Sequence, residues 1–163
     1  WVNLPARDKM APGAYQGILA ADIPTVALPE GAGTARIIAG EYGGAKGPAR
    51  TFTPINVWDV ALKAGAEVTL RLPEGHTALL VVLTGSIAVS GGQGANEAEM
   101  LLLSREGDED AIRSDAGATL LVLTGEPIDE PIVGYGPFVM NSREEIVRAI
   151  DDFNNGRFVT EAA

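Results

Sequence analysis

The chain has 163 residues, of which 46% are hydrophobic and 21% charged, and no apolar stretch is long enough to span a bilayer, so we expect a soluble globular protein. The formal net charge of -10 argues against nucleic-acid binding, because nothing would neutralise the phosphates. Cysteine is absent, which excludes disulfides, thiolate catalysis and cysteine-ligated metal sites.

The N-terminal segment, residues 1–15, is predicted to be irregular because Pro5 and Pro12 interrupt any regular element. The chain opens Trp1-Val-Asn-Leu-Pro, with no initiator Met, no basic n-region and no apolar h-region. We therefore expect no signal peptide, a processed or dissected polypeptide, and a cytoplasmic parent protein.

Short apolar runs separated by turn residues follow, and they predict an antiparallel β-barrel or jelly roll. Val68, Leu70 and Leu72 can face a core while the residues between them face water. The run 78–83 is apolar throughout, which predicts a strand buried on both faces, and Thr84-Gly predicts a turn after it. The predicted strands are residues 34–39, 57–62, 67–72, 78–83, 87–90, 99–103 and 119–124.

A glycine-rich stretch, Gly40-Glu-Tyr-Gly-Gly-Ala-Lys-Gly, has some features of a phosphate-binding loop. It fails the P-loop pattern, because Ala45 replaces the second glycine and Gly47 replaces the Ser/Thr that would hold magnesium. We interpret it as a flexible turn with a solvated Lys46.

His76 is the single histidine, so it has no second imidazole to help it bind a metal, and no Gly-x-Ser-x-Gly elbow positions a serine for it. We expect His76 to be a turn-exposed or strand-edge side chain.

A cluster of carboxylates lacks the alternating spacing and fixed glycine of a calcium loop, so we interpret it as a solvated acidic turn. Its members are Glu106, Asp108, Glu109 and Asp110.

The C-terminal region is predicted to be an extended arm rich in proline and glycine, followed by one helix. Ser142 and Glu145 form a capping box at the helix start, and Gly156 is a plausible stop. One face of the helix is apolar, at Ile146, Ala149, Ile150 and Phe153. Asp151 and Asp152 oppose the helix dipole in the last turn.

Several stretches together resemble the C-terminal half of the pirin family, which consists of two-domain cupins. They are Trp1-Val-Asn-Leu-Pro-Ala-Arg-Asp-Lys-Met, Ala39-Gly-Glu-Tyr-Gly-Gly-Ala-Lys-Gly-Pro, Thr53-Pro-Ile-Asn-Val-Trp-Asp, Pro73-Glu-Gly-His-Thr-Ala-Leu-Leu, Gly125-Glu-Pro-Ile-Asp-Glu-Pro and Tyr135-Gly-Pro-Phe-Val-Met-Asn. The resemblance implies an antiparallel cupin barrel at residues 16–125, an interdomain linker at 1–15, and an arm with one capped helix at 126–163. The barrel would be a degenerate copy of a first, N-terminal cupin.

The resemblance also allows the two metal-binding motifs of cupins to be traced. Gly85 fits the turn glycine of the first motif, which places Ala78 at the Glu position and the two His positions among residues 71–74. Gly107-Asp fits the start of the second motif, whose His position is then Ala118. Neither motif contains its ligands. Pirin-like proteins carry iron on three His and one Glu of the N-terminal cupin, so no catalytic residue and no metal ligand is assigned to this chain.

Three hypotheses follow. The first is the metal-free C-terminal half of a pirin-like dioxygenase, related to the pirins that open quercetin, with its own N-terminal cupin as partner. The second is a regulatory interaction module that binds another protein. In the third the barrel holds a small organic ligand, unless apolar side chains fill it. The candidate contact residues for a partner are Tyr135, Pro137, Phe138, Met140 and Asn141.

Overall fold

The computed structural model describes residues 1–158 and divides into two compact units. One unit, here called the barrel unit, is Ile18–Pro127. The other, called the hairpin–helix unit, combines Trp1–Gly17 with the chain from Ile128 onward. No helix within residues 1–158 is long and apolar enough to cross a membrane.

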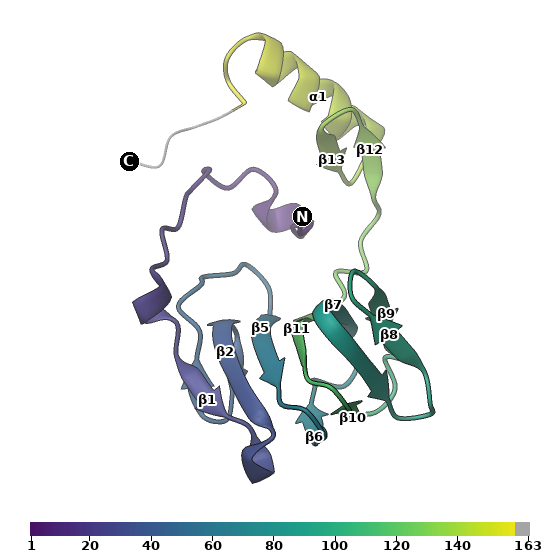
Figure 1. Ribbon diagram of the computed structural model, residues 1–163. Helices are drawn as coiled ribbons and strands as arrows, with labels where there is room; N and C mark the ends of the chain where they lie inside the picture. The colour runs from purple at the N-terminus through teal and green to yellow at the C-terminus, as the bar shows by residue number, and fades with distance from the viewer. Residues whose placement is uncertain (159–163) are drawn as a thin grey trace. The chain divides into compact units, whose positions relative to one another are not determined.

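The barrel unit is a curled antiparallel sheet (Figure 1) with the strand order β1-β2-β5-β11-β7-β10-β6, and β8 and β9 also pair with β7. Its elements are η2 (Ala20–Asp22), β1 (Thr25–Ala27), η3 (Pro29–Gly31), β2 (Gly33–Ala39), β3 (Glu41–Tyr42), β4 (Ala45–Lys46), β5 (Ile55–Leu62), β6 (Ala66–Arg71), β7 (Thr77–Val89), β8 (Gly94–Asn96), β9 (Met100–Leu102), β10 (Glu109–Ser114) and β11 (Ala118–Gly125). The predicted class, a mainly β antiparallel cupin fold, is confirmed.

Alternation along the strands builds the core. In β6 and β11 every second residue is buried, which is the pattern expected for strands with one face toward a core. Large side chains fill the interior of the curled sheet, so the sheet encloses a packed core. Its largest fully buried apolar members are Trp58, Ile37, Leu70, Leu80, Ile112, Leu120, Val60, Val82 and Val122.

The prediction of two separate strands at 78–83 and 87–90 was wrong. They form one 13-residue strand, β7, which pairs with β11 and β9 in its first half and with β8 and β10 in its second. The predicted turn at Thr84-Gly85 is a β-bulge, because the pairing with β11 skips Leu83. Gly85 has φ +79°, and a Cβ there would lie 2.3 Å from the Gly117 carbonyl oxygen, so glycine is needed at this bend.

The expectation that residues 78–83 are buried on both faces was also wrong. Leu80 and Val82 are fully buried, whereas Leu83 on the opposite face is 44% exposed. The apolar run therefore has one face in the core and one face that is only partly buried. Antiparallel sheets commonly leave one face toward solvent, unlike the parallel sheets that produce continuous apolar strands.

Some strands had no sequence signal. β10 reads Glu-Asp-Ala-Ile-Arg-Ser and was interpreted in part as an acidic turn, yet it pairs along its full length with β6. Arg71 and Glu109 form a cross-strand ion pair at 2.9 Å. The strand forms because β6 presents a hydrogen-bonding edge, and Ile112 is its one large core residue.

The hairpin–helix unit contains η1 (Ala6–Asp8), β12 (Val133–Tyr135), β13 (Phe138–Met140) and α1 (Arg143–Asn154). The predicted extended arm is thus partly a two-stranded antiparallel hairpin with Gly136 and Pro137 in its loop. Its small core consists of Phe138, Met140, Ile146 and Ala149, with Val133, Ile150 and Phe158 packed against them.

The predicted limits of the helix are confirmed. Ser142 accepts the backbone N–H of Glu145 at 3.2 Å, and the Glu145 carboxylate accepts the Ser142 N–H at 3.1 Å. After the last turn, Gly156 has φ +68°, and the N–H of Arg157 donates to the Asp152 carbonyl at 2.7 Å, as in a Schellman motif. Arg157 also pairs with Asp151 at 2.6 Å and Asp152 at 3.2 Å, which offsets the predicted conflict with the helix dipole.

Candidate functional site

The two traced metal motifs do not meet in the barrel unit. Ala78 pairs with Thr124 at one end of β11, whereas Ala118 pairs with Gly85 at the other end. Six residues of strand separate the two positions, or about 20 Å. The two traced positions therefore cannot belong to one metal site, because a metal site needs its ligands in one layer, and Thr124 is the β11 residue opposite Ala78.

Three polar side chains share that layer at the mouth of the curled sheet. They are Asn56 on β5, Thr124 on β11 and His76 in the turn before β7. Each lies an even number of residues from the buried residues of its strand, which is the spacing of side chains on the inner face of the sheet. Thr124 is 3% exposed. Of the two positions expected for His76, a turn-exposed or a strand-edge side chain, the structure fits the second. His76 is half-buried immediately before β7.

The three side chains form a continuous hydrogen-bonded series. The Asn56 amide nitrogen donates to Thr124 Oγ1 at 2.9 Å, and Thr124 Oγ1 lies 3.4 Å from His76 Nδ1. Asn56 Oδ1 accepts the backbone N–H of Glu41 at 3.2 Å, which assigns the amide orientation. The Thr124 hydroxyl can then donate to Nδ1 or accept from it, depending on the histidine tautomer. We call Asn56, Thr124 and His76 the mouth cluster.

The mouth cluster opens into a groove of about 650 Å³ that lies within the barrel unit. Two cations, Lys46 and Arg50, and one carboxylate, Glu41, line it together with several apolar side chains. The remaining lining residues are Gly40, Gly47, Pro48, Ala49, Thr51, Pro54, Ile55, Asn56, Pro73 and His76. Its volume lies within the range of small-molecule sites, which is about 300–1,000 Å³.

The glycine-rich stretch forms one wall of this groove. β3 and β4 make a tight hairpin in which Gly43 and Gly44 both have positive φ, of +56° and +79°. The stretch predicted to be a turn thus forms a two-stranded hairpin, and the next element is the strand β5, so no helix start presents N–H groups to a phosphate here. Lys46 is largely solvated, as expected, and lies 3.7 Å from Glu41.

Metal-ligating side chains do not gather in the described part of the chain. Within residues 1–158 no three His, Cys, Asp or Glu side chains are close enough to hold one ion. The predicted acidic turn is divided, since Glu109 and Asp110 belong to β10 and Glu106 and Asp108 precede it. Burial raises the pKa of the Asp110 carboxyl.

The predicted contact residues of the hairpin–helix unit fall into two groups. Tyr135 and Pro137 are exposed near the hairpin loop, and Tyr135 is 68% exposed. Phe138 and Met140 are buried against α1, so the unit's own core accounts for their apolar character. Phe138 also packs edge-on against Phe153, with ring centroids 5.9 Å apart. A role for the group in binding a partner stays a prediction.

Asn141 is part of a polar network that joins the two chain segments of this unit. Its amide nitrogen donates to Glu130 Oε2 at 3.1 Å, and the same carboxylate oxygen accepts the Ala6 N–H at 2.6 Å. The Asn141 N–H donates to Glu145 Oε2 at 2.7 Å. The sequence does not predict this role of Glu130, because nothing local shows that it lies beside residue 6.

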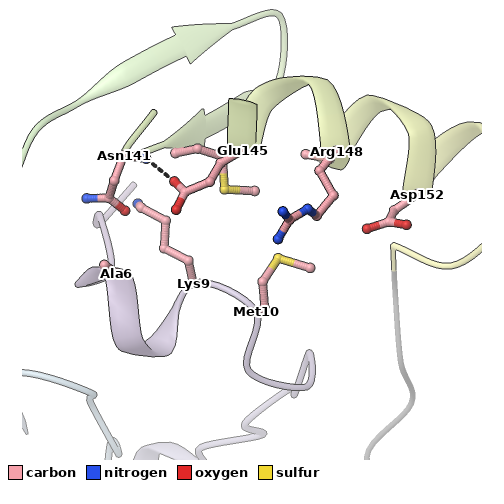
Figure 2. Close-up of a pocket in the computed structure, with 9 residues that line it drawn as sticks. Ala6, Lys9, Met10, Asn141, Glu145, Arg148 and Asp152 are labelled. Carbon is pink, nitrogen blue, oxygen red and sulfur yellow. Dashed lines mark hydrogen bonds between the residues drawn. The ribbon is translucent and has the colours of Figure 1, made fainter. Parts of the chain in front are cut away.

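A small pocket lies between η1 and α1 inside the same unit. Figure 2 shows Lys9 and Met10 extending toward α1, with Glu145, Arg148 and Asp152 extending from the helix. The pocket holds about 100 Å³, which suits a few waters or one small group but not an organic ligand of ordinary size. Its charges alternate in sign, so it favours no anion or cation strongly.

The fold and the mouth of the sheet define the class: the chain is a cupin-type β-barrel domain. Residues 57–159 match the family model described as the pirin C-terminal cupin domain. A Pseudomonas aeruginosa protein named as a putative quercetin 2,3-dioxygenase is 56% identical over 159 residues, covering 98% of this chain and 55% of that protein. The chain therefore belongs to the pirin family.

Two further relatives extend this comparison. Pirin-1 of Arabidopsis thaliana is 35% identical over 162 residues, covering 96% of this chain and 56% of that protein. A crystal structure of quercetin 2,3-dioxygenase from Acinetobacter baumannii has a TM-score of 0.90 at 52% identity, covering 97% of this chain and 55% of the other. The chain thus spans about half the length of the curated relatives it matches.

Proposed function

We propose that this chain is the C-terminal, non-metal-binding half of a pirin-like protein, and that it supports an iron-dependent N-terminal cupin of the quercetin 2,3-dioxygenase type. The relatives named above are nearly twice as long as this chain, and two of them carry that dioxygenase name. An N-terminal cupin is therefore the partner we propose for it.

The observation that carries the proposal is the set of large apolar side chains that the hairpin–helix unit leaves exposed. Ile132 is 71% exposed, Tyr135 68%, Val147 68% and Phe153 62%. Single exposed apolar residues are ordinary on protein surfaces, but aromatic and aliphatic side chains of this size are also typical anchors of an interface. We propose that Tyr135 and Ile132, close together in sequence at the hairpin, are the main anchors.

The donor set of the barrel unit supports placing iron in the other half. At the layer where cupins gather their ligands, this chain offers one imidazole, one hydroxyl and one amide, next to Ala78. Such a set does not fit a site of three histidines and one carboxylate, because hydroxyl and neutral amide groups are weak ligands for iron. No reaction step is therefore assigned to this chain.

Iron analysis is the first test of the proposal. The purified 163-residue chain is incubated with ferrous iron and desalted, and its iron content is measured by elemental mass spectrometry. We expect it to retain no stoichiometric iron. A matched variant, His76→Ala, should give the same background. Stoichiometric iron that disappears in the variant would contradict the proposal.

Association is the second test. The chain is expected to bind a separately produced N-terminal cupin half of the same protein, and Tyr135→Ala combined with Ile132→Ala should weaken binding by about tenfold or more. Leu102→Ala is the matched control, since Leu102 is 66% exposed but belongs to the barrel unit. If the chain does not bind the N-terminal half but binds another protein through Tyr135, the result would favour the alternative of a regulatory interaction module.

A further inference from the structure

The mouth groove of the barrel unit has the shape and chemistry of a ligand site. Large side chains fill the interior beneath it, so a ligand has no room inside the curled sheet. The groove itself offers about 650 Å³ at the layer of the mouth cluster. A site here therefore recognises its ligand at the rim, by groups that the structure already holds in place.

The mouth cluster forms a preorganised polar floor. Asn56 is held on one side by the Glu41 N–H and on the other by Thr124, so its amide cannot turn freely. Thr124 in turn engages Nδ1 of His76, which leaves Nε2 as the ring nitrogen for a ligand. His76 lines the groove, and its contact with Thr124 is made through Nδ1. Preorganised groups bind with a smaller entropic cost than mobile ones.

Gly40 brings a backbone wall close to this floor. A Cβ on Gly40 would lie 1.8 Å from Asn56 Oδ1, and the residue has φ +74°. The close approach is what allows the N–H of Glu41 to reach Asn56. The glycine-rich stretch therefore positions the mouth cluster, a role that a mere turn between strands would not need.

The groove walls are apolar and stiff. Pro48, Pro54 and Pro73 line it together with Ala49 and Ile55. Proline loses little conformational freedom on binding because its φ is already fixed. Such walls suit the flat apolar body of a ligand, while the floor suits a polar group at its end.

The charge of the groove selects the sign of that polar group. Lys46 and Arg50 line the groove together with one carboxylate, Glu41, so the lining carries a net charge of +1 from two cations and one anion, on a chain whose net charge is -10. The Lys46–Glu41 pair is solvent-exposed at 3.7 Å, a geometry that contributes little and can rearrange for a ligand. A monoanion matches this balance better than a phosphate, which carries more charge.

We infer that the mouth groove binds a small organic carboxylate with a flat apolar body. The carboxylate lies by His76 Nε2 and the Lys46 and Arg50 side of the groove, and the body lies against the prolines. Benzoate is the simplest probe of this class, and benzamide is its neutral counterpart of the same shape.

Titration of the full 163-residue chain with benzoate, followed by backbone amide NMR shifts, tests the inference. Saturable shifts are expected at residues 40–50 and 73–77, with benzamide at least about tenfold weaker because it lacks the charge-assisted hydrogen bonds. Equal binding of benzamide, binding of inorganic phosphate in preference to benzoate, shifts confined to other residues, or no saturation would each overturn it.

Variants sharpen the result. His76→Phe keeps the ring and removes both nitrogens, and should weaken benzoate by about tenfold, while His76→Gln keeps a donor and should restore part of the affinity. Lys46→Gln should weaken benzoate and leave benzamide unchanged. Arg113→Gln, on β10 and outside the groove lining, is the matched control and should leave both unchanged. Unaltered benzoate affinity in both His76→Phe and Lys46→Gln would contradict the assignment even if the shifts mapped to the groove.

Discussion

The barrel unit and the hairpin–helix unit solve the problem of stability in different ways. Within residues 1–158, the barrel core contains 21 buried apolar residues, whereas the core of the hairpin–helix unit contains four. The smaller unit relies on polar bonds such as Glu130 to Ala6 and on the capping box of α1. A core of that size contributes little net stability. The barrel unit thus has a large core of its own, and the hairpin–helix unit is the part that would gain more from additional packing.

The largest expected effect comes from the barrel core. Leu120→Ala on β11 should lower the free energy of unfolding of the barrel unit by about 2–5 kcal/mol, since Leu120 is fully buried and its removal leaves a cavity. Chemical denaturation followed by far-UV circular dichroism measures it. Leu102→Ala, at a side chain that is 66% exposed, should change stability by no more than about 0.5 kcal/mol. Similar losses in the two variants would contradict the assigned core.

The mouth of the barrel unit gives the next effect. Gly40→Ala should cost about 1–3 kcal/mol, because the residue has positive φ and the new Cβ would collide with Asn56 Oδ1. Gly44→Ala is the matched control, since Gly44 also has positive φ, of +79°, but nothing lies within 4 Å of the added carbon. Denaturation midpoints of both variants separate backbone strain from collision. Equal losses would show that the contact with Asn56 is unimportant.

The helix cap tests the smaller unit. Ser142→Ala should destabilise α1 by about 1 kcal/mol, because the Glu145 N–H loses its acceptor. Hydrogen exchange of the α1 amides should accelerate, while exchange of the β11 amides should not change if the two units differ as described. Ser142→Asp keeps an acceptor at the same position and should preserve most of the protection. Faster exchange in both units would mean that they unfold as one.

A pH effect should be confined to the barrel unit. Burial raises the pKa of Tyr42, which packs on Trp58 with ring centroids 4.8 Å apart. The folded chain therefore holds the phenol proton more tightly than the unfolded chain. This stabilisation is complete below the ordinary pKa of 10.0 and is lost as the pH rises through the folded pKa. Unfolding measured at pH 9 and pH 11 should show a smaller loss of stability for Tyr42→Phe than for the wild type, and an equal loss would contradict it.

Much of the fold could be predicted from local sequence. Alternation at Val68, Leu70 and Leu72 placed a strand that the structure has as β6, and Ser142 with Glu145 marked the start of α1. Such signals are local, since side-chain alternation and capping depend on neighbouring residues. The prediction of a turn at Thr84-Gly85, which divides β7 into two strands, failed because glycine is common both in β-bulges and in turns. Only the pairing with β11 distinguishes the two.

The candidate site was less predictable. The sequence marks His76 only as the single histidine, and it marks neither Asn56 nor Thr124 as a site residue. A signal did exist, because each is a polar residue that continues the alternating series of core residues in its strand. On β5, for example, Asn56 has the same spacing as the buried Trp58 and Val60. The signal has meaning only when the strands are aligned, and the antiparallel register could not be obtained from composition or spacing.

By itself the sequence determined the membership of the pirin family, the mainly β class and the capped helix. These properties depend on residue identity and short-range periodicity. Only the tertiary structure decided that Ala118 lies far from Ala78, that Phe138 and Met140 pack inside their own unit, and that Asn56, Thr124 and His76 meet. The reason is physical: strand register brings together side chains that are up to 68 residues apart in the chain.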